Sequence, residues 1–322
     1  MLGNNVTVFG GSGFVGREVV NALSKAGYVV TLVVRRPERF REFALFPNTK
    51  VVALSGYDKA DELYATLQHA DIMVNLTADR LTGTEKVEEA DLVGVAQKLK
   101  AAAEHMGVKR VLSLSLIGAS STKGDNDWLR HLGEADGLMM GVVKADVTVL
   151  RAGLLIGPND GVTSAFIKQL DRMALLMVAN ADTVVQPLWV KDFAQAFVQA
   201  IPQKALFNQK IEVAGEERLS VKELGELVAE IKQKTAIVFP MCRLNAKFMV
   251  FLGALAPFAS VSAQQLLTLK EDSDTDQDFA TRFGFMPSSL EWVIASYATV
   301  HHIRERYNFY RREAGRNSRE LV

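Results

Sequence analysis

The sequence predicts an α/β fold in which helices cover both faces of a doubly wound parallel sheet, with a small C-terminal region on the ligand side. Apolar strand-like runs alternate with amphipathic helical stretches over the first 151 residues, which is the order that a parallel sheet requires. A glycine-rich turn follows the first strand at once, and the elements become shorter after Gly157-Pro158. We therefore expect a sheet domain over 1–151, a smaller region over 152–299 that partly returns to it, and a basic tail helix over 300–322.

The first strand, Val6–Phe9, leads directly into a glycine motif and a helix over Phe14–Ala26. Gly10 permits the tight turn, Gly13 lets the backbone approach a pyrophosphate, and Gly16 lets the helix pack closely on the sheet. The helix N-terminus adds free N–H groups and a positive dipole end. This arrangement is typical of a Rossmann-type dinucleotide site. The predicted cradle is Gly10, Gly11, Ser12, Gly13, Phe14, Val15 and Gly16.

An arginine pair follows the second strand, Val29–Val34. A site that prefers NAD places an acidic residue about here, and that residue would repel the 2′-phosphate of NADP. A guanidinium instead pairs with the phosphate in a forked, charge-assisted contact. We therefore predict that NADP(H) is the preferred cofactor and NAD(H) the second candidate, with Arg35 better placed than Arg36. The alternative is that both arginines are solvated loop residues.

Further strands are predicted over Lys50–Leu54, Asp71–Leu76, Arg110–Leu116 and Asp146–Arg151, with helices over about 60–69, 85–105 and 127–143. Ligands in such sheets bind beyond the carboxyl ends of the strands. The glycine motif, Arg35, the turn Asn75–Asp79 and residues Ser115–Ala119 should therefore surround one crevice. Later in the chain, Ser220 and Glu223 form a capping box that predicts the start of a helix.

Composition excludes several other classes of protein. The formal net charge is zero, so we predict no nucleic-acid partner, and the single Cys242 excludes an internal disulfide. The first strand begins within five residues of the first residue, which leaves no room for a signal or transit peptide. The longest apolar stretch, Phe248–Ala259, is too short to span a bilayer as a helix. No metal site is expected, because His301-His302 has no further ligand at a suitable spacing.

Short motifs over nearly the whole chain are shared with one superfamily. They are the glycine motif, Arg35, Asp58, Asn75-Leu-Thr-Ala78, Val108-Lys-Arg-Val111, Leu150-Arg-Ala-Gly-Leu-Leu-Ile-Gly-Pro158 and Val190-Lys-Asp192. Together they resemble the extended, atypical branch of the short-chain dehydrogenase/reductases. The C-terminal run Phe283-Gly-Phe-Met-Pro-Ser-Ser-Leu-Glu-Trp-Val293 looks most like the subgroup of the nucleotide-binding accessory subunit of mitochondrial complex I and its bacterial relatives. The cofactor-binding residues that complete the expected site are Arg36, Asp58, Leu76, Thr77, Ala78 and Ser115.

Active members of this superfamily use a Tyr-x-x-x-Lys pair and a hydroxyl at the end of the fifth strand. The pair exchanges a proton with the substrate oxygen as hydride moves. The resemblance aligns the tyrosine with Trp128 and the lysine with Leu132, and the hydroxyl falls nearer Ile117 than Ser115. An indole N–H is no acid near neutral pH, and leucine has neither charge nor hydrogen bond. We therefore assign no catalytic residue.

Two functions stay open. The favoured one is a dinucleotide-binding protein without the usual chemistry. The resemblance implies an accessory or assembly factor in respiratory-complex or quinone metabolism. We expect such a protein to be cytoplasmic or peripheral to the inner membrane. The other is an NAD(P)H-dependent oxidoreductase that acts on a quinone, enone or lipid-like carbonyl with a non-standard proton donor.

Two segments could contact a membrane-associated complex or an anionic membrane surface. Residues 243–258 are strongly apolar with a cationic start, so they either cover the crevice or face a membrane or partner. Residues 300–319 carry six arginines with aromatic residues among them, so they either dock on such a surface or form a solvated terminal helix.

Overall fold

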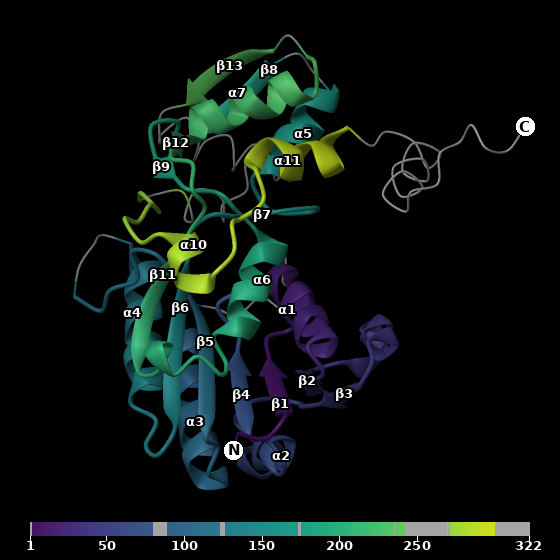
Figure 1. Ribbon diagram of the computed structural model, residues 1–322, viewed down its shortest axis with the longest axis vertical. Helices are drawn as coiled ribbons and strands as arrows, with labels where there is room; N and C mark the ends of the chain where they lie inside the picture. The colour runs from purple at the N-terminus through teal and green to yellow at the C-terminus, as the bar shows by residue number, and fades with distance from the viewer. Residues whose placement is uncertain are drawn as a thin grey trace, which may run out of the picture.

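The computed structural model describes residues 2–79, 89–122, 126–172, 175–234, 236–241, 269 and 271–299. Both segments considered for membrane or partner contact, 243–258 and 300–319, lie outside these ranges, and the expectations for them stay predictions. Figure 1 shows a larger lobe built around a sheet and a smaller lobe stacked on it.

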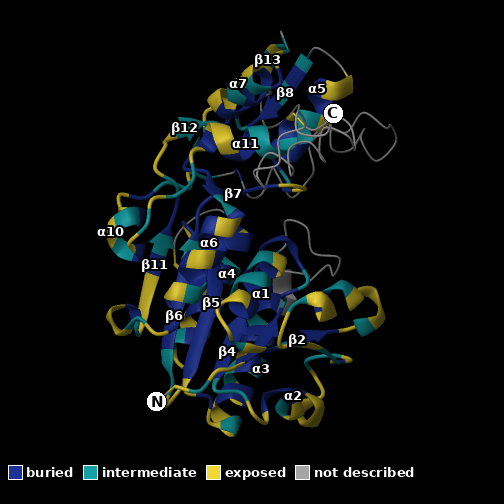
Figure 2. Cartoon of the chain, turned by 45° about the vertical axis from the view of Figure 1, so that its right-hand side comes forward, coloured by how far each residue is buried: buried dark blue, intermediate teal, exposed yellow. Residues whose placement is uncertain are grey.

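A seven-stranded parallel sheet forms the centre of the larger lobe in the described chain. The strand order reverses between β1 and β4, and ligands of doubly wound sheets bind at such a reversal. Figure 2 shows the central strands as mostly buried. The predicted doubly wound, Rossmann-type fold is therefore confirmed. In spatial order the strands are β11 (Gln209–Val213), β6 (Asp146–Ala152), β5 (Arg110–Leu116), β4 (Ile72–Asn75), β1 (Asn5–Phe9), β2 (Val29–Val34) and β3 (Thr49–Ala53).

Helices cover both faces of this sheet. On one face α1 (Phe14–Lys25) packs beside α6 (Val190–Gln199). On the other, α3 (Glu89–Met106) packs between α2 (Ala60–Leu67) and α4 (Asp127–Met140). Three short 3₁₀ helices, η1 (Pro37–Arg39), η2 (Arg41–Leu45) and η3 (Lys204–Leu206), lie in the connections. The sheet is thus covered by a two-helix layer and a three-helix layer.

The smaller lobe has a hydrophobic core of its own. Its helices α5 (Thr163–Arg172), α7 (Val221–Ile231) and α11 (Leu290–Ala298) pack around short strand pairs. By contrast α6, β11 and α10 (Phe279–Phe283) bury their apolar side chains in the core of the larger lobe. The chain after residue 152 therefore crosses between the two cores more than once. The strand pairs are β7 (Leu155–Ile156) with β10 (Leu188–Trp189), β9 (Val184–Val185) with β12 (Leu219–Ser220), and β8 (Leu175–Ala179) with β13 (Ile237–Met241).

Arg110, at the start of β5, ties the sheet to the C-terminal end of α6. Its side chain is fully buried, with Nε 3.0 Å from the Ile201 carbonyl and Nη2 2.9 Å from the Ala200 carbonyl. The guanidinium also lies over the Phe207 ring, 4.3 Å from its centre. Burial lowers the pKa of Arg110 to about 10, so the side chain stays charged at neutral pH. The positive charge therefore meets the negative dipole end of α6.

We predict that Arg110→Met lowers the free energy of unfolding by roughly 3 kcal/mol, because buried carbonyl groups lose their donors. Urea denaturation measures the change. Arg130→Met is the matched control, since Arg130 is only partly buried on α4, with 41% of its side chain exposed, and pairs with the exposed Asp127. We expect its effect to stay below about 1 kcal/mol. Equal effects of the two substitutions would show that the buried contacts contribute nothing specific.

Candidate dinucleotide-binding site

The turn between β1 and α1 has no room for side chains at two of its glycines. Gly10 has a φ of +73°, and a Cβ there would lie 2.6 Å from the carbonyl carbon of Leu76. A Cβ on Gly16 would lie 2.5 Å from the carbonyl carbon of Gly11. Both obstacles are backbone atoms, which cannot rotate away. The atoms nearest to a Cβ on Gly16 thus belong to the loop that leaves β1.

The turn that follows β4 lies directly against the glycine loop. The backbone N–H of Leu76 donates to the Phe9 carbonyl at 2.8 Å. The side-chain oxygen of Asn75 accepts from the backbone N–H of Thr77 at 3.1 Å and from its hydroxyl at 2.7 Å. Asn75 therefore fixes this turn beside Gly10. The predicted lining residues of the turn are all buried, namely Leu76, Thr77 and Ala78.

Asp79 ends this turn with its carboxylate at the start of α1. Its Oδ2 accepts from the backbone N–H of Val15 at 2.7 Å and from that of Gly16 at 3.1 Å. A Cβ on Gly13 would lie 2.8 Å from Cγ of Asp79. The first N–H groups of a helix lack partners within the helix and carry its positive dipole end. The N–H groups of Val15 and Gly16, which we predicted to bind a pyrophosphate, are therefore arranged to bind an anion. In this structure they donate to the carboxylate of Asp79.

Asp79 was expected at the crevice as part of the turn Asn75–Asp79, without a role of its own. An available signal was its position just beyond β4, because β4 adjoins β1 in doubly wound sheets. An acidic residue there faces the start of the first helix.

The residues expected on the adenine and ribose side follow β2 and β3. Arg35 and Arg36 are exposed directly after β2. Asp58 is exposed between β3 and α2 and forms an ion pair with Lys98 of α3. The structure thus brings the two arginines and Asp58 to the carboxyl edge of the sheet that also holds the glycine loop.

The two positions that the resemblance aligns with the tyrosine and lysine of active reductases are apolar and buried. Trp128 is 5% exposed and Leu132 is 1% exposed, and both belong to the main hydrophobic core. Ser115 is fully buried beside Asp136, whose Oδ2 lies 3.0 Å from Nε and 2.9 Å from Nη2 of Arg151. Burial raises the pKa of Asp136, and the charge of Arg151 opposes the rise. Ser115 therefore belongs to a buried polar cluster below the crevice.

A small cavity of about 20 Å³ lies at the carboxyl ends of β5 and β6, where the reactive end of a dinucleotide would be expected. It has room for about one water molecule. Its lining is mostly apolar, with polar groups from Glu271 and Ser273. The apolar lining residues include Leu116, Ile117, Leu129, Ala152 and Leu154.

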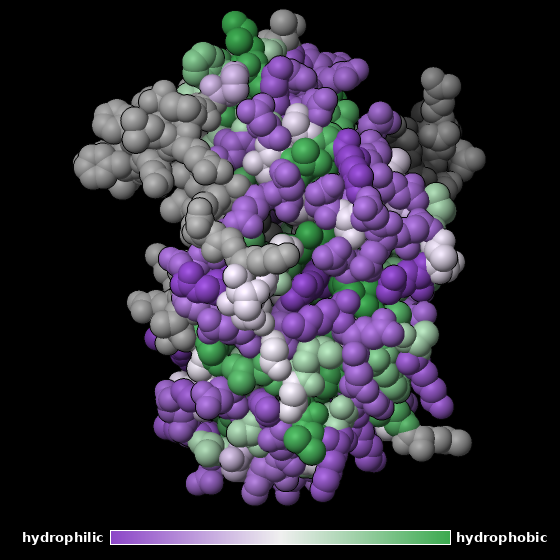
Figure 3. All heavy atoms as spheres, turned by 90° about the vertical axis from the view of Figure 1, so that its left-hand side faces the viewer, coloured by the Kyte–Doolittle hydropathy of each residue, from purple (hydrophilic) through white to green (hydrophobic). Residues whose placement is uncertain are grey.

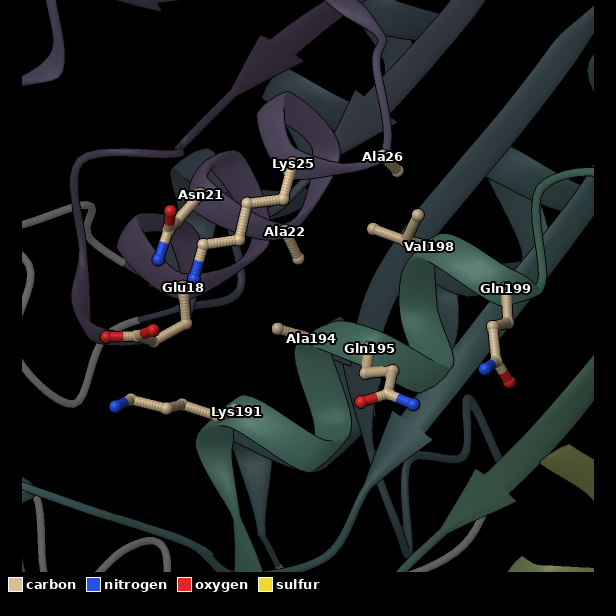
Figure 4. A pocket seen from close by; sticks show the side chains of 10 residues that line it. All are labelled: Glu18, Asn21, Ala22, Lys25, Ala26, Lys191, Ala194, Gln195, Val198 and Gln199. Atoms are coloured by element: carbon tan, nitrogen blue, oxygen red, sulfur yellow. The ribbon is translucent and has the colours of Figure 1, made fainter. Parts of the chain in front are cut away.

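A separate surface groove of about 430 Å³ runs between α1 and α6. Figure 4 shows Ala22, Ala194 and Val198 facing one another between the two helices, with Lys25 and Lys191 among the charged side chains around them. Glu18 also lines the groove, so its charges are mixed. The glycine loop and Arg35 do not line it, which separates this groove from the predicted cradle.

Comparison with known proteins gives the class to which this fold and site belong. Residues 10–171, half of the chain, match the NAD(P)H-binding family, so the chain belongs to that family. It is also homologous to NADH dehydrogenase [ubiquinone] 1 alpha subcomplex subunit 9, mitochondrial. The Arabidopsis thaliana protein is 28% identical over 271 residues, which cover 80% of this chain and 66% of that protein. The Rattus norvegicus protein is 25% identical over 296 residues, 88% of this chain and 77% of that protein.

Solved structures share the fold over most of its length. A triphenylmethane reductase of Citrobacter sp. complexed with NADP(H) matches with a TM-score of 0.73 at 14% identity, over 91% of this chain and 99% of that one. An NADPH-dependent quinone oxidoreductase of Escherichia coli complexed with NADPH matches with a TM-score of 0.72 at 16% identity, over 90% and 98%. The expected resemblance to the atypical reductases and to the complex I subunit is confirmed.

We predict that Gly16→Ala destabilises the protein by about 1–3 kcal/mol, because the new methyl group meets the backbone of Gly11. Thermal unfolding monitored by circular dichroism tests this. The control is Gly137→Ala on α4, where a Cβ meets nothing within 4 Å. That substitution should stabilise the helix by about 0.5–1 kcal/mol. A stabilising Gly16→Ala would contradict the crowded geometry of the loop.

Proposed function

We propose that this protein binds NADP(H) in the cradle formed by the glycine loop and Arg35, and does not use it for ordinary dehydrogenase turnover. The bound dinucleotide then stabilises the fold or reports redox state within a respiratory or quinone-related assembly. The proposal is supported by the contrast between the backbone donors at the start of α1, which suit an anion, and the buried, apolar Trp128 and Leu132. A ligand that binds only the native state stabilises it by about 2.7 kcal/mol at a hundredfold excess over its dissociation constant.

The preference for NADP(H) is supported by the charge after β2. Arg35 and Arg36 are exposed at the strand end that borders the ribose of a dinucleotide, where NAD-preferring sites carry an acid. The NADP(H)-bound structural neighbours agree with this choice.

We predict that Arg35→Asp shifts the preference from NADPH toward NADH, because the carboxylate repels the 2′-phosphate and can accept from the ribose hydroxyls. Calorimetric titration of the protein with each nucleotide gives the ratio of the two dissociation constants. Lys168→Asp makes the same change of charge on an exposed residue of α5 and should leave the ratio as it is. An unchanged ratio in Arg35→Asp would refute the role of Arg35.

The non-catalytic part of the proposal is supported by the chemistry of α4. Neither an indole nor an aliphatic side chain supplies a proton to a substrate oxygen near neutral pH. A second candidate, a reductase of quinones or enones, is favoured by the similarity to the E. coli quinone oxidoreductase and by Glu271 at the cavity.

The two candidates differ in steady-state turnover. We predict that the purified protein binds NADPH and oxidises it no faster than background when a panel of quinones and enones is added. Absorbance at the nicotinamide band follows the oxidation, and nucleotide binding is measured on the same sample. Sustained oxidation that disappears in Glu271→Gln would establish the second candidate in place of the first.

We further propose that the smaller lobe contacts a membrane-associated partner, as the complex I homology suggests. Ile237 and Phe239 of β13 are 71% and 55% exposed and directly precede the apolar segment 243–258. The face seen in Figure 3 is mainly hydrophilic. Hydrophobic residues lie at the tip of the smaller lobe, where β13 lies in Figure 1, and also in the middle and lower parts of this face. Among the helices that the structure describes, none combines the length and apolar character needed to cross a bilayer.

A further inference from the structure

The backbone donors at the start of α1 already hold an anion from the chain itself. The carboxylate of Asp79 lies 2.7 Å from the Val15 nitrogen and 3.1 Å from the Gly16 nitrogen. These are the N–H groups that the proposed dinucleotide needs for its pyrophosphate. One pair of donors cannot serve both acceptors.

We propose that Asp79 is a built-in competitor for the dinucleotide phosphates and thereby determines which ligands the site accepts. A nucleotide binds only when it displaces the carboxylate from the amides of Val15 and Gly16. This inference rests on the proposed function, because it concerns the same cradle.

The carboxylate of Asp79 occupies the space over Gly13, since a Cβ on that glycine would lie 2.8 Å from Cγ of the aspartate. The positive end of the helix dipole stabilises an anion at this place. A carboxylate already bound there repels a second anion that approaches the same donors.

The fold itself holds Asp79 at this place. Its backbone N–H donates to the Leu76 carbonyl at 2.9 Å, and the Leu76 N–H donates to the Phe9 carbonyl at 2.8 Å. The Asp79 backbone is therefore tied to β1, so displacement must act mainly on the side chain.

This competition makes the site selective. A ligand that offers only a pyrophosphate replaces the contact of the Asp79 carboxylate with these amides by a similar charge-assisted contact. It therefore gains little binding free energy. A ligand that also carries a 2′-phosphate gains a second contact with Arg35, which adds to the exchange at α1. Asp79 and Arg35 thus act together to favour NADP(H) over smaller phosphate compounds.

The test compares the full-length protein with Asp79→Asn, which keeps the size of the side chain and removes its charge. The control is Asp182→Asn, which removes the same charge from an exposed residue of the smaller lobe. Calorimetric titrations use three probes, namely NADPH, inorganic pyrophosphate and adenosine 2′-monophosphate, which lacks the pyrophosphate. We expect Asp79→Asn to bind NADPH and pyrophosphate about tenfold more tightly, which corresponds to about 1.4 kcal/mol. Binding of adenosine 2′-monophosphate should stay as in the wild type and in Asp182→Asn.

Unchanged or weaker binding of NADPH and pyrophosphate by Asp79→Asn overturns the inference. If neither protein binds NADPH or NADH, the proposed function has failed, and the pyrophosphate titration still decides the inference. Tighter binding of pyrophosphate by Asp79→Asn then supports it, and equal or absent binding by both proteins overturns it.

A measurement on the wild-type protein covers the case in which Asp79→Asn does not fold. Pyrophosphate or NADPH should shift the amide NMR signals of Val15 and Gly16 together with the side-chain carboxyl signal of Asp79. Amide shifts without a change at the Asp79 carboxyl group would overturn the inference.

Discussion

The backbone N–H groups at the start of α1 need an acceptor, and this requirement organises the ligand edge of the sheet. The helix cannot supply a partner for its own first turn, so the acceptor has to come from a neighbouring segment or from a ligand. The turn after β4 comes close to the start of α1 because Gly10 presents no side chain to it. Gly16 likewise presents no side chain to Gly11 of the loop. Asn75 then fixes the turn so that the Asp79 carboxylate reaches the helix.

Two other carboxylates of the chain also accept hydrogen bonds from backbone N–H groups near helix ends. Asp160 accepts from the backbone N–H groups of Gly157, Val162 and Ser164 before α5, and burial raises its pKa. Asp192, in the first turn of α6, accepts from the backbone N–H of Ser288 at 2.6 Å, which joins α6 to the chain entering α11. Asp160 thus orders the start of α5 in the smaller lobe, whereas Asp192 links α6, which packs in the core of the larger lobe, to the chain that enters α11. Asp79 differs because its donors belong to a motif whose geometry suits a ligand.

Much of the larger lobe could be predicted from the sequence because its signals are local. Strands buried on both faces read as apolar runs, so β2 and β5 match their predicted bounds and β1 differs by one residue. The capping box at Ser220 and Glu223 marked the start of α7 in the same way. The smaller lobe was predicted less well, since strands of two residues such as β7 and β10 show no periodicity.

The contacts of single side chains were beyond prediction where they depend on tertiary neighbours. Asp79 and Val15 are 64 residues apart, and only the adjacency of β4 and β1 brings them together. Likewise the sequence predicts Ser115 at the end of a strand. It does not show that the Ser115 side chain lies beside the buried Asp136, which pairs with Arg151. At α4, Trp128 and Leu132 are buried in the main hydrophobic core. A lysine at position 132 would have to bring its ammonium group into these surroundings, which is costly without a partner. Core packing therefore determines this part of the sheet edge, whereas the start of α1 presents N–H donors to a carboxylate, so two parts of one sheet edge are under different physical constraints.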